Sequence, residues 1–208
     1  MDDSIDLGIF THLLTETVDH LRYLSMYGPE ENDMLEAIAR LREVLAQSDN
    51  VEEEILAGLL NTLMWRSTIV AVISVVCLNH ASQELLERLW EVLDAGSWVT
   101  PQIAAVLFFY DAEFEQKAIA RVKQGCPLTD QPLFLSESEK QLWGSLPSDA
   151  YLRQCKAVSS LVSMLEKSQK YGDIFSDEKV KQMLEDDIDH GGQIAKDWLN
   201  RVRVYFKL

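Results

Sequence analysis

The chain has 208 residues and a hydrophobic fraction of 47%, which suits a globular core and excludes a disordered or collagen-like chain. Nineteen Lys and Arg residues stand against 34 Asp and Glu residues, so the formal net charge is -15. This balance argues against a nucleic-acid-binding protein, whose binding surface is basic, and against binding to an anionic membrane surface.

Apolar residues recur at spacings of three and four along nearly the whole chain, which is the period of an amphipathic helix and predicts an all-α fold. The expected helices span residues 10–27, 33–47, 51–64, 68–79, 83–95, 101–110, 112–124, 137–146, 149–170, 177–188 and 192–206. Two prolines interrupt the pattern over 125–135, which predicts a loop there. We expect one all-helical domain over 1–208, in which this loop joins a helical array (1–124) to a C-terminal helical cap (136–208).

Several features predict a cytoplasmic protein that does not enter a membrane. The charge-free window 67–83 has an apolar part shorter than the roughly 20 residues of a spanning helix, so we expect a buried helix there. The acidic segment 1–6 lacks the basic start of a signal peptide. Cys77, Cys126 and Cys155 are odd in number and widely spaced, which favours reduced thiols.

The chain matches itself weakly at a step of 29 residues. The aligned sets are Leu56, Leu85 and Phe114; Leu60, Leu89 and Ala118; and Met64, Leu93 and Val122. Within each unit these positions are four residues apart and therefore share one face of a helix. A helix pair of this size needs neighbours to bury that face, so the match predicts stacked helix pairs. A generic antiparallel bundle with chance matches is the alternative.

The clearest unit spans residues 100–124. Pro101 opens its first helix, Asp111 lies at the tight turn, and the small residue Ala118 lies on its second helix. This unit resembles a HEAT-type repeat. The resemblance implies antiparallel helix pairs stacked as a short right-handed array. The step is shorter than in that family, and Gln116 stands where the family usually has Arg.

Sequence motifs for catalysis and metal binding are missing. The chain contains no His-Glu-x-x-His, Cys-x-x-Cys or Gly-x-Ser-x-Gly motif and no phosphate-binding glycine loop. We therefore expect no enzyme activity, no metal and no cofactor. The alternative is an enzyme with a dispersed site around His12, Glu16 and His20, whose spacing of four would place them on one face of the helix expected over 10–27.

The acidic residues are concentrated near the start of the chain. Residues 1–64 contain 14 acidic and 3 basic residues, a net charge of -11. Individual acids there also stabilise helix starts, but together they predict an acidic surface that attracts a basic protein. The candidate partner-binding residues are Glu30, Glu31, Asp33, Glu53, Glu54, Glu84, Glu87, Glu91, Asp94 and Glu113. Trp65, Trp90 and Trp98 are candidate anchors near that surface, unless they belong to the core.

A small, acidic, all-helical chain resembles the bacterial immunity proteins that act as antitoxins. The resemblance is one of overall character and has no diagnostic motif. It implies a non-enzymatic, cytoplasmic protein that binds and neutralises a basic partner, such as a secreted toxin. The alternative of a different kind is a helical-repeat adaptor or scaffold that binds a peptide or protein in a groove.

Overall fold

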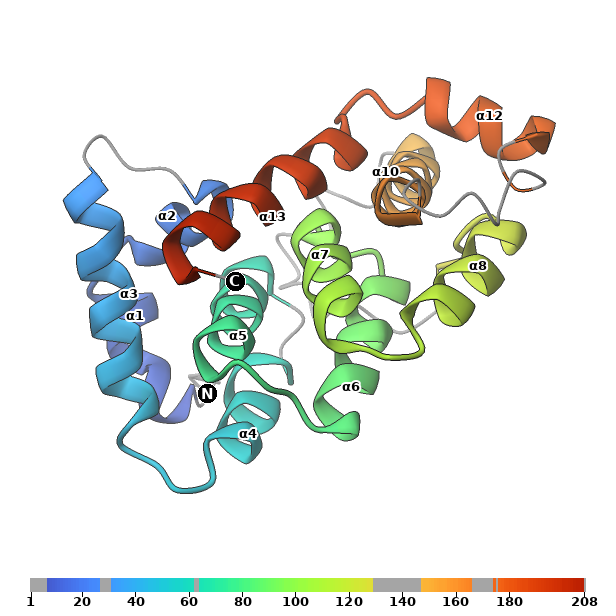
Figure 1. Cartoon of the computed structure of the whole chain (residues 1–208). Coiled ribbons are helices and arrows are strands. Elements are labelled where there is room, and N and C mark those ends of the chain that lie inside the picture. The colour runs from blue at the N-terminus through green and yellow to red at the C-terminus, as the bar shows by residue number, and fades with distance from the viewer. Residues whose placement is uncertain are drawn as a thin grey trace.

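A computed structural model describes residues 7–26, 31–61, 64–128, 147–165, 174 and 176–207. Within these residues the fold is all-α, as the sequence predicts, and contains no strand (Figure 1). The elements, in chain order, are the 3-10 turn η1 (Gly8–Phe10), α1 (Thr11–Thr15), α2 (Asp19–Ser25), α3 (Glu31–Leu45), α4 (Val51–Glu54), the π-helical turn η2 (Ile55–Leu59), α5 (Trp65–Leu78), α6 (Gln83–Asp94), α7 (Thr100–Tyr110), α8 (Phe114–Gln124), α10 (Pro147–Leu165), α12 (Glu178–Glu185) and α13 (Gly191–Phe206).

Two helices, α5 and α7, form the centre of the core. Every residue from Ser67 to Val76 and from Thr100 to Leu107 is buried. A helix that is apolar on all sides is stable only when other elements surround it, and α7 packs against α5, α6, α8, α10 and α13. The window 67–83 is therefore largely a core helix, as expected. No described helix has both the length and the apolar character needed to cross a membrane.

Helices α6 and α8 are amphipathic and cover α7. Their buried faces contain the residues that align in the 29-residue step: Leu85, Leu89, Leu93, Phe114, Ala118 and Val122. The first unit of that step differs, because the helix expected over 51–64 ends in a π-helical turn, with Leu60 N donating to Ile55 O at 3.0 Å. Met64 then has extended backbone angles. The right-handed HEAT-like stacking remains a prediction.

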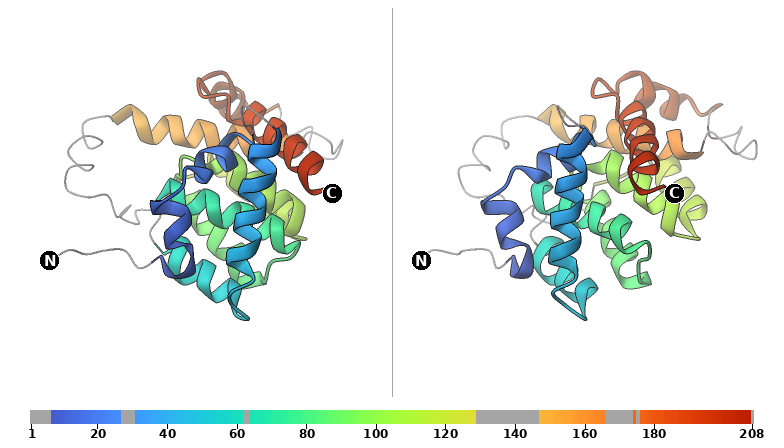
Figure 2. Two further views of the ribbon diagram at one scale, coloured as in Figure 1. Left: turned by 90° about the vertical axis from the view of Figure 1, so that its left-hand side faces the viewer. Right: turned by 60° about the vertical axis from the view of Figure 1, so that its left-hand side comes forward.

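The prediction of a single helix over 10–27 is wrong, because the helix is interrupted between α1 and α2. The hydroxyl of Thr17 donates to Leu13 O at 2.8 Å and accepts from Asp19 N at 3.3 Å, so the side chain replaces helical backbone hydrogen bonds. The new helix directs Asp19 and His20 into the protein, where both are buried. Helices α2 and α3 pack on α5 as an outer layer (Figure 2).

Helix α13 connects the C-terminal helices with the N-terminal layer. At its start, a Cβ on Gly192 would lie 2.9 Å from the backbone oxygen of Ser159, so the glycine lets α13 touch α10 directly. Further along, Trp198 Nε1 donates to Tyr23 O at 2.8 Å. Helix α13 also packs along α7. The helix expected over 137–146 and most of the loop 125–135 lie outside the described residues.

Candidate functional site

The predicted partner-binding acids fall into separate groups. Glu30 and the side chain of Glu31 lie outside the described residues, and Asp33 is half-buried near the start of α3. The other seven lie on α4, on α6 and just before α8. Four of these seven carboxylates have a basic partner within the chain.

Lys117 on α8 neutralises the acids at one end of the α6–α8 contact. Its ammonium lies 2.6 Å from Glu87, 3.1 Å from Asp111 and 3.3 Å from Glu113. Trp90 Nε1 donates to Asp111 at 2.7 Å. Burial alone would raise the pKa of Asp111, but these hydrogen bonds and the Lys117 charge hold that pKa below its usual value. The Lys117 hydrogen bond likewise lowers the pKa of Glu87.

Two arginines form ion pairs with the next two acids along α6, Glu91 and Asp94. Arg121 donates to both oxygens of Asp94 at 2.7 Å, and its guanidinium lies 4.2 Å from the centre of the Trp90 ring. Arg88 donates to Glu91 at 2.7 Å. Of the seven acids, Glu87, Glu91, Asp94 and Glu113 are therefore engaged within the chain. Glu87 and Asp94 pair across to α8, whereas Glu91 pairs within α6 and Glu113 with Lys117 four residues along, and the charge of all four is largely compensated.

The remaining acids gather where α4 and α6 begin. The carboxylate of Glu52 accepts hydrogen bonds from Ser82 N at 3.0 and 3.2 Å and lies 3.1 Å from His80 Nδ1. This contact brings the starts of α4 and α6 together. Glu53 and Glu84 are exposed and form no ion pair with another described residue.

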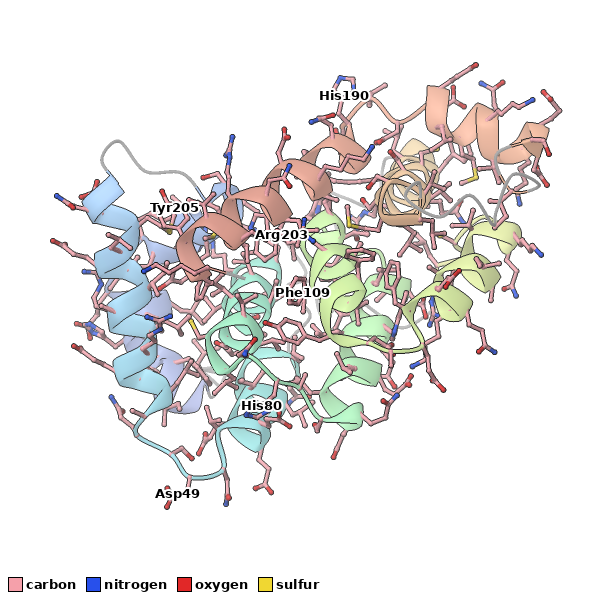
Figure 3. All side chains as sticks on the ribbon, viewed as in Figure 1. Asp49, His80, Phe109, His190, Arg203 and Tyr205 are labelled. Atoms are coloured by element: carbon pink, nitrogen blue, oxygen red, sulfur yellow. The ribbon has the colours of Figure 1, made fainter. Side chains whose placement is uncertain are left out.

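We call Asp49, Glu52, Glu53, Glu54 and Glu84 the acidic edge. Asp49, Glu52, Glu53 and Glu54 come from the segment between Arg42 and Arg66, which contains no Lys or Arg, and Glu84 is added by the start of α6. Asp49 and His80 mark this end of the molecule in Figure 3. No described Lys or Arg forms an ion pair with an acid of the acidic edge, in contrast to Glu87, Glu91, Asp94 and Glu113.

The three residues of the proposed dispersed enzyme site do not converge. His12 and Glu16 pair with each other at 3.0 Å on the surface, where more than half of each side chain is exposed. His20 is buried, with its ring edge-on to Trp65 at 5.7 Å. Burial and the nearby Arg66 charge lower the pKa of His20. The described residues contain no group of three His, Cys, Asp or Glu side chains suited to a metal ion.

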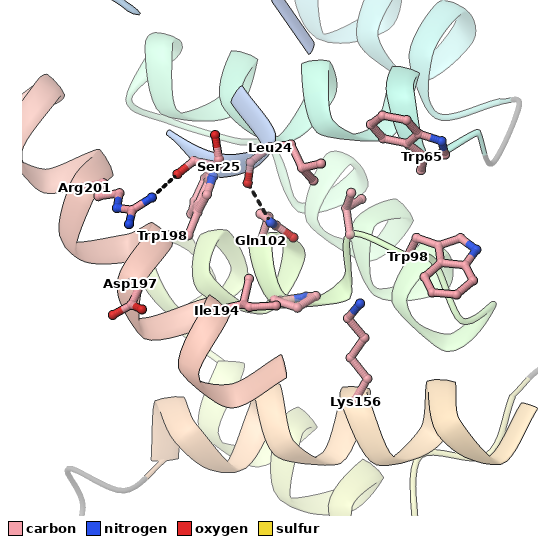
Figure 4. Close-up of a pocket in the computed structure, with 12 residues that line it drawn as sticks. Leu24, Ser25, Trp65, Trp98, Gln102, Lys156, Ile194, Asp197, Trp198 and Arg201 are labelled. Carbon is pink, nitrogen blue, oxygen red and sulfur yellow. Dashed lines mark hydrogen bonds between the residues drawn. The ribbon is translucent and has the colours of Figure 1, made fainter. Parts of the chain in front are cut away.

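A pocket of about 660 Å³ lies where α2, α5, α7, α10 and α13 meet. Its walls are mostly apolar and include Trp65, Trp98, Trp198 and Ile194, so we call it the tryptophan pocket (Figure 4). Trp98 begins the turn before α7, and two cations lie over its ring: Arg153 at 5.1 Å and Lys156 at 5.3 Å.

Two polar side chains reach into the tryptophan pocket. Gln102 is 3% exposed; its amide nitrogen donates to Leu24 O at 2.9 Å, while its Oε1 has no hydrogen-bond partner among the described residues. Lys156 is 8% exposed and its ammonium lies 3.3 Å from Asp189. Figure 4 shows the Lys156 side chain rising from α10 toward the pocket.

Only part of this pocket could be predicted from the sequence. Trp65 and Trp98 were candidate anchors and line it, whereas Trp90 belongs to the core. Gln102, Lys156 and Trp198 were not singled out. The available signal for Gln102 is that it is the one amide side chain in the otherwise apolar helix α7.

Comparison with known proteins finds no family model that matches the chain, and no significant match to a curated protein or a solved structure.

Proposed function

We propose that this chain is a non-enzymatic binding protein whose acidic edge binds a basic protein partner. The observation that carries the proposal is the exposure of Glu53 and Glu84, which have no ion-pair partner among the described residues. The Glu52 contact with Ser82 holds the two helix starts together, so these charges act on the same partner surface.

Charge at this position favours association more than it favours folding. Exposed, uncompensated carboxylates repel one another and contribute little to stability. They do attract a positively charged surface and raise the rate of encounter well above that of a neutral pair. We therefore restrict the partner-binding site to the acidic edge, because Glu87, Glu91, Asp94 and Glu113 are already paired with Lys117, Arg88 or Arg121.

The class of protein that fits this description best is an immunity protein, which acts in the cytoplasm and neutralises a toxin made by the same cell. Support comes from the net charge of -15, the all-α fold and the concentration of uncompensated acid at one edge. A basic toxin is the partner that such an edge suits. The toxin gene is expected beside the gene for this chain.

The test uses the product of that neighbouring gene as the partner. Association is followed by stopped-flow fluorescence at low and at physiological ionic strength, with wild type and the double variant Glu53→Lys/Glu84→Lys. We expect salt to slow association of the wild type, because exposed charges are screened over about 8 Å at 0.15 M. We expect the double variant to associate at least about tenfold more slowly at low salt.

The matched control is Glu178→Lys/Glu185→Lys on α12, which changes the net charge by the same amount through exposed residues away from the acidic edge. This control is expected to retain nearly the wild-type association rate. If association slows equally in both double variants, the net charge of the chain sets the association rate and the acidic edge is not the binding surface. If the neighbouring product fails to bind and its toxicity is not relieved by co-expression, the immunity assignment is wrong.

A further inference from the structure

We propose that the tryptophan pocket binds a small aromatic carboxylic acid that carries an N–H or O–H donor. This inference does not depend on the acidic edge, because the pocket lies among other helices and uses different residues. Three observations define the ligand: the size and walls of the cavity, the open acceptor of Gln102, and the cations around Trp98.

The size and walls of the cavity suit a compact aromatic body. Small-molecule sites are typically about 300–1,000 Å³, mostly apolar and equipped with few polar groups, and the pocket holds about 660 Å³. In Figure 4, Trp198 lies on one side of Gln102, and Trp65 and Trp98 lie on the other. Flat aromatic walls on both sides favour a flat ligand through stacking and edge contacts.

The open acceptor of Gln102 specifies a donor on the ligand. Because the amide nitrogen donates to Leu24 O, the orientation of the amide is fixed and Oε1 is the atom left without a partner among the described residues. Leaving a buried acceptor without a partner is unfavourable. A ligand N–H or O–H that reaches Oε1 removes that cost, so it binds more tightly than an analogue without the donor.

The charges around the pocket favour an anionic group. Lys156 and Arg153 lie over the ring of Trp98, and Arg201 is a further cation in the lining. Asp189 pairs with Lys156 but is more exposed, with 41% of its side chain accessible against 10% for Lys156. The other acid of the lining, Asp197, points away from Gln102 and Lys156 in Figure 4. A ligand carboxylate that reaches the buried Lys156 ammonium therefore gains a charge-assisted hydrogen bond.

The probe is indole-3-propionate, which combines an aromatic ring, an N–H donor and a carboxylate. Two analogues each lack one feature: 1-methylindole-3-propionate has no donor, and indole-3-propionamide has no charge. Each compound is titrated into the full chain by calorimetry. We expect one binding site for the acid and at least about tenfold weaker binding of each analogue, which corresponds to about 1.4 kcal/mol, because each analogue lacks one contact that the acid makes.

An NMR spectrum of the tryptophan indole N–H groups locates the binding. The chain contains five tryptophans. Signals of Trp65, Trp98 and Trp198 are expected to shift on adding indole-3-propionate. Trp90 is an internal control, because its N–H is held by Asp111 in the core away from the pocket. Shifts that spread to Trp90, or no shift at all, would overturn the proposal.

Three variants complete the test. Gln102→Leu removes the acceptor, Lys156→Met removes the charge but keeps the stem, and Ile194→Trp fills the cavity from its rim, where Ile194 is 36% exposed. Each is expected to weaken binding of indole-3-propionate at least tenfold. Gln102→Leu should also abolish the preference over the N-methyl analogue, and Lys156→Met the preference over the amide.

The remaining outcomes decide against the proposal. If indole-3-propionamide binds as tightly as the acid, the pocket accepts a neutral group such as an aromatic side chain of a partner protein. If binding is unchanged in Ile194→Trp, the probe binds elsewhere. Because Ile194 lies at the rim, this variant keeps the test decisive even if a substitution at the buried Gln102 prevents folding.

Discussion

Arg40 and Asp19 form a two-point ion pair, in which Nε and Nη2 of the arginine donate to the two carboxylate oxygens at 2.8 Å. Asp19 is fully buried, and Arg22 donates to it as well at 2.8 Å. Burial alone would raise the pKa of Asp19, but the hydrogen bonds and charges of the two arginines outweigh it and hold that pKa below its usual value. The pair fixes the short helix α2 against α3.

Arg40→Met is expected to lower the free energy of unfolding by about 3 kcal/mol, because it leaves a buried carboxylate with one cation instead of two. Urea unfolding measures the loss. Arg22→Met is the matched control and should cost less, since Arg22 donates a single hydrogen bond to Asp19. Equal losses for the two variants would show that the two-point geometry of Arg40 adds nothing.

Stability should fall as the pH is lowered from 7.5 to 5, and His20 accounts for part of the fall. The pKa of His20 is below its unfolded value, so the unfolded chain takes up the proton first and is favoured as the pH drops. Its contribution is complete above the unfolded pKa and is lost as the pH falls toward the folded pKa. His20→Gln should flatten this part of the profile, measured by urea unfolding at a series of pH values.

Asp19 contributes a second loss at lower pH, with the same sign. Because its folded pKa is depressed, its stabilising effect is present above the unfolded value and disappears as the pH falls through the folded one. Asp19→Asn should remove this loss of stability at acidic pH and leave the loss that is due to His20. If His20→Gln changes only the loss of stability at acidic pH, the assignment of the two losses to His20 and Asp19 is wrong.

Asp111→Ala should destabilise the chain by about 2–3 kcal/mol, because it removes the acceptor for Trp90 Nε1 and for Glu113 N and leaves Lys117 without its buried partner. Thermal unfolding by calorimetry measures this loss. Glu113→Ala, which removes an exposed partner of the same lysine, should change stability by less than about 0.5 kcal/mol. A large effect of Glu113→Ala would show that the ion pairs act as one network instead.

Gly192→Ala should destabilise the chain, although alanine favours a helix by up to about 1 kcal/mol. The added Cβ would lie 2.7 Å from Ser159 Oγ and 2.9 Å from its backbone oxygen, and forcing α13 away from α10 costs about 1–3 kcal/mol. Gln193→Ala, at the exposed neighbouring position, is the control and should change stability by less than about 0.5 kcal/mol. Chemical unfolding of both variants tests the sign: a stabilised Gly192→Ala variant rules out close packing.

Helices with a strong apolar period could be predicted well from the sequence. The expected helices over 83–95 and 101–110 correspond closely to α6 and α7, because each has a clear start: Ser82 accepts from Leu85 N, and Pro101 lies in the first turn. The break after α1 could not be predicted, since it depends on a Thr17 hydrogen bond and on the distant partner Arg40 that draws Asp19 inward.

The candidate sites were harder to predict for a related reason. The sequence shows where acids are concentrated, but it does not show that Lys117, Arg88 and Arg121 compensate four of them. The tryptophan pocket combines residues that lie far apart in the sequence, such as Trp65 and Trp198, and no periodic pattern records that relation. Gln102 is recognisable as a site residue only when its open oxygen is seen.

The hydrogen bond from Trp198 to Tyr23 joins residues 175 positions apart. While the chain is being synthesised, α2 emerges long before Trp198 has been added. The packing of the N-terminal helices is therefore completed only when α13 is present. The tryptophan pocket, which takes Trp198 from α13 and Leu24 from α2, is complete only after α13 has emerged. A nascent chain therefore lacks the complete pocket until α13 has left the ribosome.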